Sequence, residues 1–146
     1  MPKKLAKKEF TLLKEQGYSV KALQLYINRV NVGSMGRPDV VFAYTGPCGD
    51  TMKIYLKLGE NGVIQDAKFQ YDGCLGLACS GSALTTLIIG KRVEEARKIT
   101  VEDLLKELGG LPEIKRHCAK LAVTTLRKAL EKLRDCKIVV DLKEYL

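Results

Sequence analysis

The chain has 146 residues, of which 46% are hydrophobic and 29% are charged. This length supports one compact domain with a core, and the composition excludes a collagen-like or intrinsically disordered chain. The longest apolar stretches, such as residues 84–89, are far shorter than the roughly 18 apolar residues that a membrane-spanning helix needs. Because no signal or transit peptide is recognisable either, we expect a cytoplasmic protein.

The formal net charge is +8, and the positive excess lies at the two ends of the chain. Residues 1–24 hold six lysines and two glutamates, residues 113–146 hold nine basic and five acidic groups, and residues 25–112 are balanced. Most of the excess is lysine, without the interleaved aromatic and arginine residues typical of nucleic-acid sites. Solvated helix faces or an acidic protein partner explain the charge more simply, so neither nucleic acid nor a membrane is expected as a partner.

The first half of the chain predicts two helices followed by an antiparallel meander. Gly17 is expected to end a helix over 3–16, and Ser19 to cap a second one over 20–30. After a Gly- and Pro-containing loop, period-2 alternation predicts strands at 40–45, 51–58 and 63–71. Asn61-Gly62 is expected to form the second hairpin turn, since both residues tolerate positive φ.

The second half of the sequence is predicted to be mainly helical. We expect helices over 77–90 and 101–108, the latter capped by Thr100 with Asp103. Pro112 is expected in the first turn of a long helix, which carries apolar residues at helical spacing: Leu121, Leu126, Leu130 and Leu133. Residues 137–142 are compatible with either a strand or a helical end. The fold class is therefore α+β, with a small three-stranded antiparallel sheet and helices packed on one face.

Three of the five cysteines occupy comparable places. Cys48 lies between the first two strands, Cys74 follows the third strand, and Cys118 lies in the first turns of the last helix. At such boundaries a side chain can point outward, and a helix N-terminus favours the thiolate that binds metals. Their spacing contains no CxxC pair and fits no zinc finger, so buried, nucleophilic and metal-binding roles all remain open on spacing alone.

The residues around these cysteines form longer motifs. They are Gly46-Pro47-Cys48-Gly49-Asp50, Tyr71-x-Gly73-Cys74 and Leu111-Pro112-x-Ile114-Lys115-x-His117-Cys118, preceded by YINRVNVGSM at residues 26–35. In this order, they resemble the IscU/NifU-type iron–sulfur cluster scaffold family. The resemblance covers roughly residues 19–134 and implies a single domain over 1–146, with a basic helical extension at 1–18 and a C-terminal tail at 135–146.

The resemblance implies that the protein is a scaffold rather than an enzyme, and that it builds a transient cluster and transfers it to apo-proteins. Cys48, Cys74 and Cys118 then correspond to the three cluster-ligand cysteines, Asp50 to the family's aspartate and His117 to its histidine. A [2Fe–2S] cluster is expected, with [4Fe–4S] as the alternative and zinc as an occupant of the apo form. Three soft thiolates with one harder ligand suit a cluster that must leave again.

The resemblance also implies partners. A cysteine desulfurase would supply sulfur as a persulfide, and apo iron–sulfur clients would receive the cluster. Leu111, Pro112 and Lys115 lie in a stretch that resembles the family's recognition segment for an Hsp70-type chaperone, although Glu113 replaces a second proline.

Two cysteines and one rival function remain to be distinguished. Cys79 lies five positions after Cys74, which places the two about 140° apart on a helix, so we interpret it as buried filler. Cys136 lies beyond the matching region. The rival is a zinc-containing, SufU-type persulfide transfer protein. That branch has an insertion before the last helix and lacks the histidine, and this chain differs in both respects.

Overall fold

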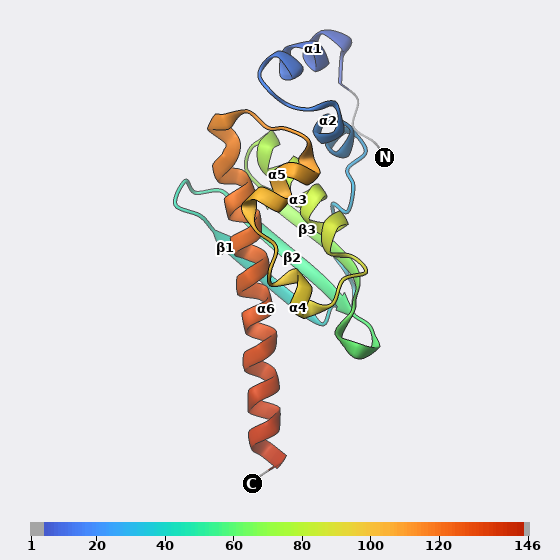
Figure 1. The fold of residues 1–146 in the computed structure, drawn as a ribbon, viewed down its shortest axis with the longest axis vertical. Coiled ribbons are helices and arrows are strands. Elements are labelled where there is room, and N and C mark those ends of the chain that lie inside the picture. The colour runs from blue at the N-terminus through green and yellow to red at the C-terminus, as the bar shows by residue number, and fades with distance from the viewer. Residues whose placement is uncertain (1–4, 145–146) are drawn as a thin grey trace.

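The computed structural model describes the backbone of residues 5–144 and the side chains of residues 5–133. Three strands lie between two N-terminal and four C-terminal helices (Figure 1). The elements are α1 (Lys7–Glu15), α2 (Val20–Ile27), β1 (Val40–Thr45), β2 (Thr51–Leu58), β3 (Ile64–Asp72), α3 (Leu75–Ile88), α4 (Val93–Ala96), α5 (Val101–Leu108) and α6 (Arg116–Glu144).

The sheet is an antiparallel meander in the order β1-β2-β3. Its register aligns Phe42 with Ile54 and Ile54 with Phe69. The alternation predicted for β2 holds for Met52, Ile54 and Leu56, which are fully buried, but Tyr55 on the opposite face is also buried. Asn61 and Gly62 both have positive φ, as the predicted hairpin turn requires.

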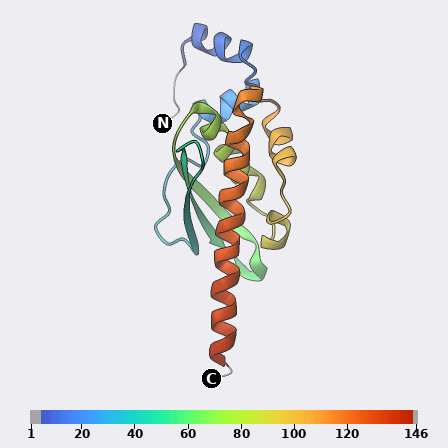
Figure 2. The same ribbon diagram turned by 90° about the vertical axis from the view of Figure 1, so that its left-hand side faces the viewer.

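Helices α3 and α6 pack on one face of this sheet, which confirms the predicted α+β class (Figure 2). Helix α3 lies on β3, α6 crosses β1 and β2, and α5 packs against both helices. Eleven residues of α3 are buried, so it is the central helix of the domain. Phe69 of β3 lies directly against Gly81 of α3, because a Cβ added there would be 2.3 Å from the ring.

The structure corrects one expectation about the helices, settles one open point and adds one helix. The last helix begins at Arg116 and not at Pro112, which instead precedes a separate 3-10 turn, Glu113–Lys115. Residues 137–142, left open between strand and helix, continue α6 to Glu144. Helix α4 was not predicted at all, because a four-residue helix is too short to show a periodic pattern.

The residues just before α2 join the N-terminal segment to the C-terminal half. Tyr18 is 5% exposed and belongs to the core, although the sequence places it in the extension. The Ser19 backbone N–H donates to the Gly110 carbonyl, and its hydroxyl donates to the Leu108 carbonyl. The same hydroxyl oxygen accepts from the Ala22 N–H, which confirms the predicted cap.

Ser19→Ala is therefore expected to lower the free energy of unfolding by about 1–2 kcal/mol. The variant loses the cap and the hydrogen bond to the Leu108 carbonyl together. Urea denaturation followed by circular dichroism measures the change. Ser19→Thr keeps a hydroxyl and should retain most of the stability; equal losses in both variants would contradict this account.

Candidate metal centre

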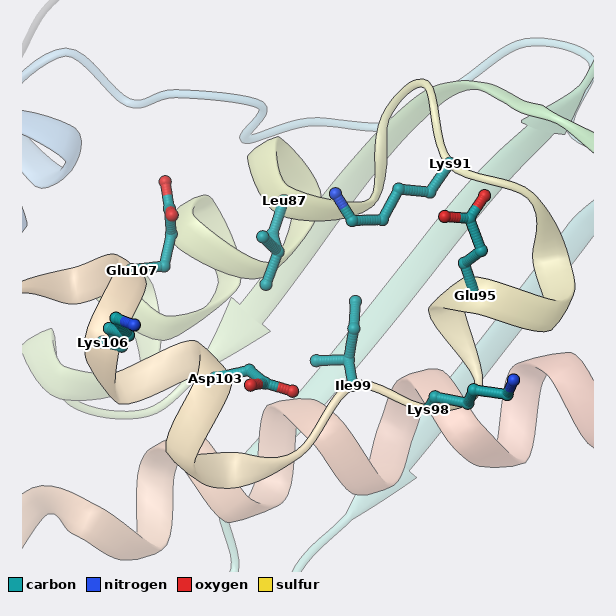
Figure 3. A pocket seen from close by; sticks show the side chains of 8 residues that line it. All are labelled: Leu87, Lys91, Glu95, Lys98, Ile99, Asp103, Lys106 and Glu107. Carbon is teal, nitrogen blue, oxygen red and sulfur yellow. The ribbon is translucent and has the colours of Figure 1, made fainter.

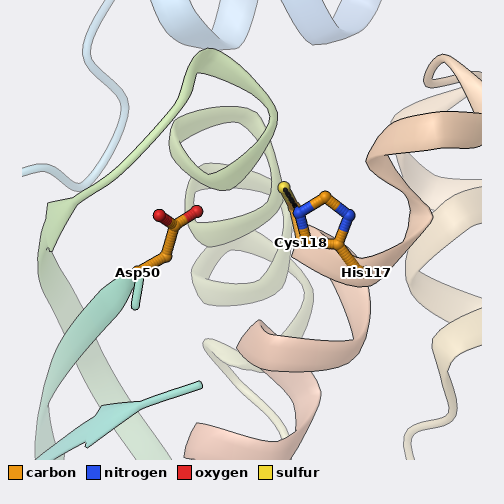
Figure 4. A group of neighbouring side chains, drawn as sticks. All are labelled: Asp50, His117 and Cys118. Atoms are coloured by element: carbon orange, nitrogen blue, oxygen red, sulfur yellow. Dashed lines mark hydrogen bonds between the residues drawn. The ribbon is translucent and has the colours of Figure 1, made fainter. Parts of the chain in front are cut away.

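Three segments distant in sequence meet at one end of the domain. The turn between β1 and β2 contributes Asp50, the N-cap of α3 contributes Cys74, and the first turn of α6 contributes His117 and Cys118. Figure 4 shows Asp50 facing the two α6 residues across the start of α3. Helix ends and a tight turn hold these side chains, so the fold itself brings them together.

The potential ligand atoms are close to one another. One atom each from Asp50, His117 and Cys118 lie within 4.8 Å of one another. The Cys74 Sγ lies 3.3 Å from the Cys118 Sγ, and the Cys118 Sγ lies 3.6 Å from the His117 Nε2. Two thiols, an imidazole and a carboxylate are a donor set that suits zinc or iron. The residues therefore fit a soft-metal centre.

The His117 ring is already oriented for a role as ligand. Its Nδ1 lies 2.9 Å from the Ile114 carbonyl oxygen, which can only accept a hydrogen bond. The Nδ1 of the neutral ring therefore carries the proton, and the Nε2 lone pair faces the Cys118 thiol. A backbone carbonyl that fixes the second ring nitrogen is the usual support of a metal-binding histidine.

Two glycines create the space for this arrangement. A Cβ on Gly73 would lie 2.8 Å from the Asp50 Cγ, too close for the carboxylate to keep its position. A Cβ on Gly76 would lie 3.2 Å from both the Cys118 Sγ and the Lys115 Cβ. The absence of these two side chains lets the turn and α6 approach the beginning of α3.

The two neighbouring thiols differ in their tendency to ionise. Burial raises the pKa of the Cys74 thiol. Hydrogen bonds from Cys118 and from the Leu77 and Gly76 amides, together with the charge of Lys115, lower the pKa by more than burial raises it. The pKa of Cys74 is therefore below its usual value. Burial and then the bond to Cys74 raise the pKa of Cys118 to about 12. The two thiols titrate as one coupled pair, in which Cys74 ionises more readily than Cys118.

Alkylation is expected to distinguish the thiols. Cys74 should react with iodoacetamide at a lower pH than an unperturbed thiol, because its pKa lies below 9.0. Cys79 should stay unmodified in the folded protein, because burial raises its pKa to about 12. Peptide mass spectrometry after timed alkylation between pH 6 and 9 measures both rates. Modification of Cys79 as fast as that of Cys74 would contradict the assignment.

The structure arranges the three predicted ligand cysteines unequally. Cys74 and Cys118 are in contact, and Cys118 is fully buried, so it does not use the outward orientation that its place at an element boundary allows. Cys48 is exposed at the tip of the turn that also carries Asp50, and it is outside the Asp50, His117 and Cys118 group. Pro47 precedes it and Gly49, with φ of +87°, follows it, and the Gly46 N–H donates to the Asp50 carbonyl across the turn.

Cys79 behaves as the sequence predicts. Its thiol is buried and donates to the Ala22 carbonyl on α2, away from the Cys74–Cys118 pair. It therefore fills the core between α2 and α3. Cys136 lies outside the residues whose side chains the structure describes.

The expected chaperone segment is only partly accessible. Pro112 is buried, Leu111 and Lys115 are half-buried, and Ile114 is 78% exposed. Lys115 also lies near enough to Cys74 to stabilise its thiolate. A partner that binds the side chains of Leu111 and Pro112 would have to displace them from the domain. The side chain of Ile114 is already exposed.

Sequence reasoning did not single out Tyr18 as part of this region. Burial, followed by the charges that Cys74, Cys79 and Cys118 can carry, raises the pKa of its phenol to about 12. Tyr18 therefore lies beside the thiols as a neutral, buried group. No motif in the sequence indicates this, because its neighbours in space come from distant segments.

A second concave region lies away from the sulfur atoms. A cavity of about 660 Å³ opens between α3, α4 and α5, with Leu87 and Ile99 among its lining residues (Figure 3). The other lining residues are charged: Lys91, Glu95, Lys98, Asp103, Lys106 and Glu107. This lining contains neither cysteine nor histidine, so it does not contribute to the metal centre. Among the described residues, no helix is both long and apolar enough to cross a membrane.

Comparison with known proteins identifies the family to which this fold and donor set belong. Residues 17–138 match the family described as NifU-like N terminal domain, and the chain belongs to that family. The match confirms the resemblance noted in the sequence.

Individual relatives agree with this family. The chain is 42% identical over 114 residues to the iron-sulfur cluster assembly scaffold protein IscU 1 of Archaeoglobus fulgidus, covering 77% of this chain and 74% of that one. It is 38% identical over 117 residues to the scaffold protein IscU of Haemophilus influenzae, covering 77% and 92%. The fold resembles the crystal structure of a NifU-like N-terminal protein from Brucella abortus, with a TM-score of 0.66 and 18% identity, covering 84% and 98%.

Proposed function

We propose that this protein is a scaffold on which an iron–sulfur cluster is assembled and from which it is transferred to apo-proteins. The observation that carries the proposal is the convergence of Cys74, Cys118, Asp50 and His117 at one end of the domain. Family membership and relatives named as cluster assembly scaffolds support it. In this role the cluster is cargo, and the protein binds and releases it.

The proposed ligands are the thiolates of Cys48, Cys74 and Cys118, completed by Asp50 or His117. Cys48 would join the others by a rearrangement of the turn that it shares with Asp50. Thiolates hold iron firmly, and a carboxylate or imidazole is a harder, more exchangeable ligand. We take [2Fe–2S] as the product, [4Fe–4S] as the alternative, and zinc as an occupant of the same ligands before assembly.

The proposed sulfur source is a cysteine desulfurase partner that carries a persulfide. A thiolate of the scaffold attacks the outer sulfur, the partner's S–S bond breaks, and the partner's thiolate leaves. Cys74 suits this attack, because it is half-exposed and its pKa is lowered. Residues 111–115 are the proposed contact for an Hsp70-type chaperone, and the reducing cytoplasm is the proposed location.

Anaerobic reconstitution tests the proposal. The reduced protein is incubated with ferrous iron, cysteine and a cysteine desulfurase, and its visible spectrum and iron, sulfide and zinc contents are measured. A stable iron–sulfur chromophore that passes to an apo-ferredoxin is the expected result. Stoichiometric zinc without a chromophore, combined with stimulation of the desulfurase, would favour the SufU-type persulfide carrier.

Asp50→Ala is expected to slow transfer of the cluster to apo-ferredoxin by about tenfold, a typical effect of altering the surroundings of a metal. The variant replaces a hard, labile donor beside the thiols by a methyl group. Transfer is followed by the circular dichroism of the acceptor. Asp72→Ala, which removes an exposed carboxylate at the end of β3, is the control; faster transfer from the Asp50 variant would contradict the assignment.

A further inference from the structure

The contact between Cys74 and Cys118 permits a second chemistry. Their Sγ atoms are 3.3 Å apart. A disulfide bond has an S–S length of about 2.05 Å, so the atoms need to approach by only about 1.2 Å to become bonded. Among the four cysteines with described side chains, this pair alone is in sulfur–sulfur contact, since the Cys79 thiol donates to a backbone carbonyl.

The two thiols differ in access to solvent. Cys74 is half-buried at the N-cap of α3, whereas Cys118 is 0% exposed. A dissolved oxidant therefore meets Cys74 first, and Cys118 lies directly behind it. Gly76 leaves room beside the buried thiol, because a Cβ there would be 3.2 Å from the Cys118 Sγ. The arrangement is that of an attacking thiol with a second thiol in position to resolve the product.

We propose that Cys74 and Cys118 form a peroxide-reactive dithiol whose oxidation to an intramolecular disulfide closes the metal centre. The Cys74 sulfur attacks one oxygen of hydrogen peroxide, the O–O bond breaks, and a sulfenic acid and water form. The Cys118 sulfur then attacks the sulfenic sulfur, the S–O bond breaks, and hydroxide leaves with the Cys118 proton as water. Two thiols lose two electrons, and one peroxide becomes two waters.

The disulfide removes both sulfurs as metal ligands, because only thiolates bind the metal. Asp50, His117 and the exposed Cys48 then remain, a set with one thiolate in place of three, which binds iron or zinc less tightly than the full set. Dithiol reductants reverse the bond by exchange. The claim that this disulfide regulates cluster assembly rests on the proposed function. The oxidation of the two thiols does not depend on that function.

The oxidation is tested on the reduced, metal-free full chain. The protein is treated with a small excess of hydrogen peroxide, free thiols are blocked with N-ethylmaleimide, and proteolytic peptides are identified by mass spectrometry. The expected product joins the peptides of Cys74 and Cys118, which lose their free thiols in equal amounts while Cys79 keeps its thiol. In Cys118→Ser the bond cannot form, and dimedone should trap the sulfenic acid at Cys74.

Cys48→Ser is the matched control, and it should form the same internal disulfide as the unaltered protein. A bond between Cys48 and Cys74, disulfides between chains, or oxidation of Cys74 with Cys118 unchanged would each overturn the assignment. Circular dichroism verifies that the variants are folded.

Zinc uptake tests the closure of the site. Zinc binding by the oxidised protein should fall by about tenfold or more and return after treatment with dithiothreitol. Unchanged zinc binding with the disulfide in place would overturn the regulatory role. Failure of the reduced protein to assemble a cluster would instead contradict the proposed function, and it would leave the peptide result unaffected.

Discussion

Replacing Cys118 by alanine is expected to abolish the iron–sulfur chromophore of the reconstituted protein, whereas replacing Cys79 by alanine is expected to leave it intact. Both thiols are fully buried, and burial raises the pKa of each to about 12. They differ in their neighbours. Cys118 contacts Cys74 and the His117 Nε2, whereas Cys79 donates to a backbone carbonyl on α2.

The two substitutions each remove one sulfur atom from a fully buried position, so a difference between them reports on the role of the sulfur and not on burial. Bound iron and sulfide are measured after anaerobic reconstitution and gel filtration, and thermal unfolding shows whether both variants fold. Cys118→Ala should bind less than about one tenth of the iron of the unaltered protein. A normal chromophore in Cys118→Ala, or its loss in Cys79→Ala alone, would show that the centre is assigned to the wrong sulfur.

Gly81→Ala is expected to destabilise the fold by about 2–3 kcal/mol, in the upper part of the range for overpacked cores. The added Cβ would lie 2.3–2.7 Å from three atoms of the Phe69 ring. Phe69 is fully buried between the sheet and α3, so the ring cannot rotate out of the way. Either α3 must move from β3 or the ring must adopt a strained rotamer.

Urea denaturation measures this effect, and two further variants isolate its cause. Gly36→Ala adds a methyl group at a position with nothing within 4 Å, and it should change the stability by less than about 0.5 kcal/mol. Gly81→Ala combined with Phe69→Leu should be more stable than the sum of the two single changes predicts, because the smaller side chain relieves the clash. Additive losses would show that the ring is not the source of the strain.

The sheet could be predicted from the sequence because its signals are local. Met52, Ile54 and Leu56 alternate with polar or aromatic residues, and Asn61-Gly62 supplies the positive φ values of the turn. The helix caps Ser19 and Thr100 were predicted for the same reason, since each bonds within its own first turn. Features that depend on distant residues, such as the burial of Tyr18, leave no local pattern.

The candidate metal centre also has features that the sequence predicts and features that it does not. The motifs identify Cys74, His117 and Cys118, and family resemblance assigns them a common role. The sequence could not predict that Cys118 is buried behind Cys74, because this depends on how α6 crosses α3. It also gave no reason to select Gly76, whose importance lies in the side chain that it lacks.

The attachment of Ser19 to Leu108 and Gly110 couples the start of the chain to the segment that precedes α6. Gly17 packs against Pro112 in the same place. A displacement of Pro112 would therefore disturb the packing of Gly17 next to Tyr18, which is enclosed beside the sulfur atoms. The loop before α6 is therefore connected to the candidate metal centre in two ways, through the beginning of α6 and through residues 17–19.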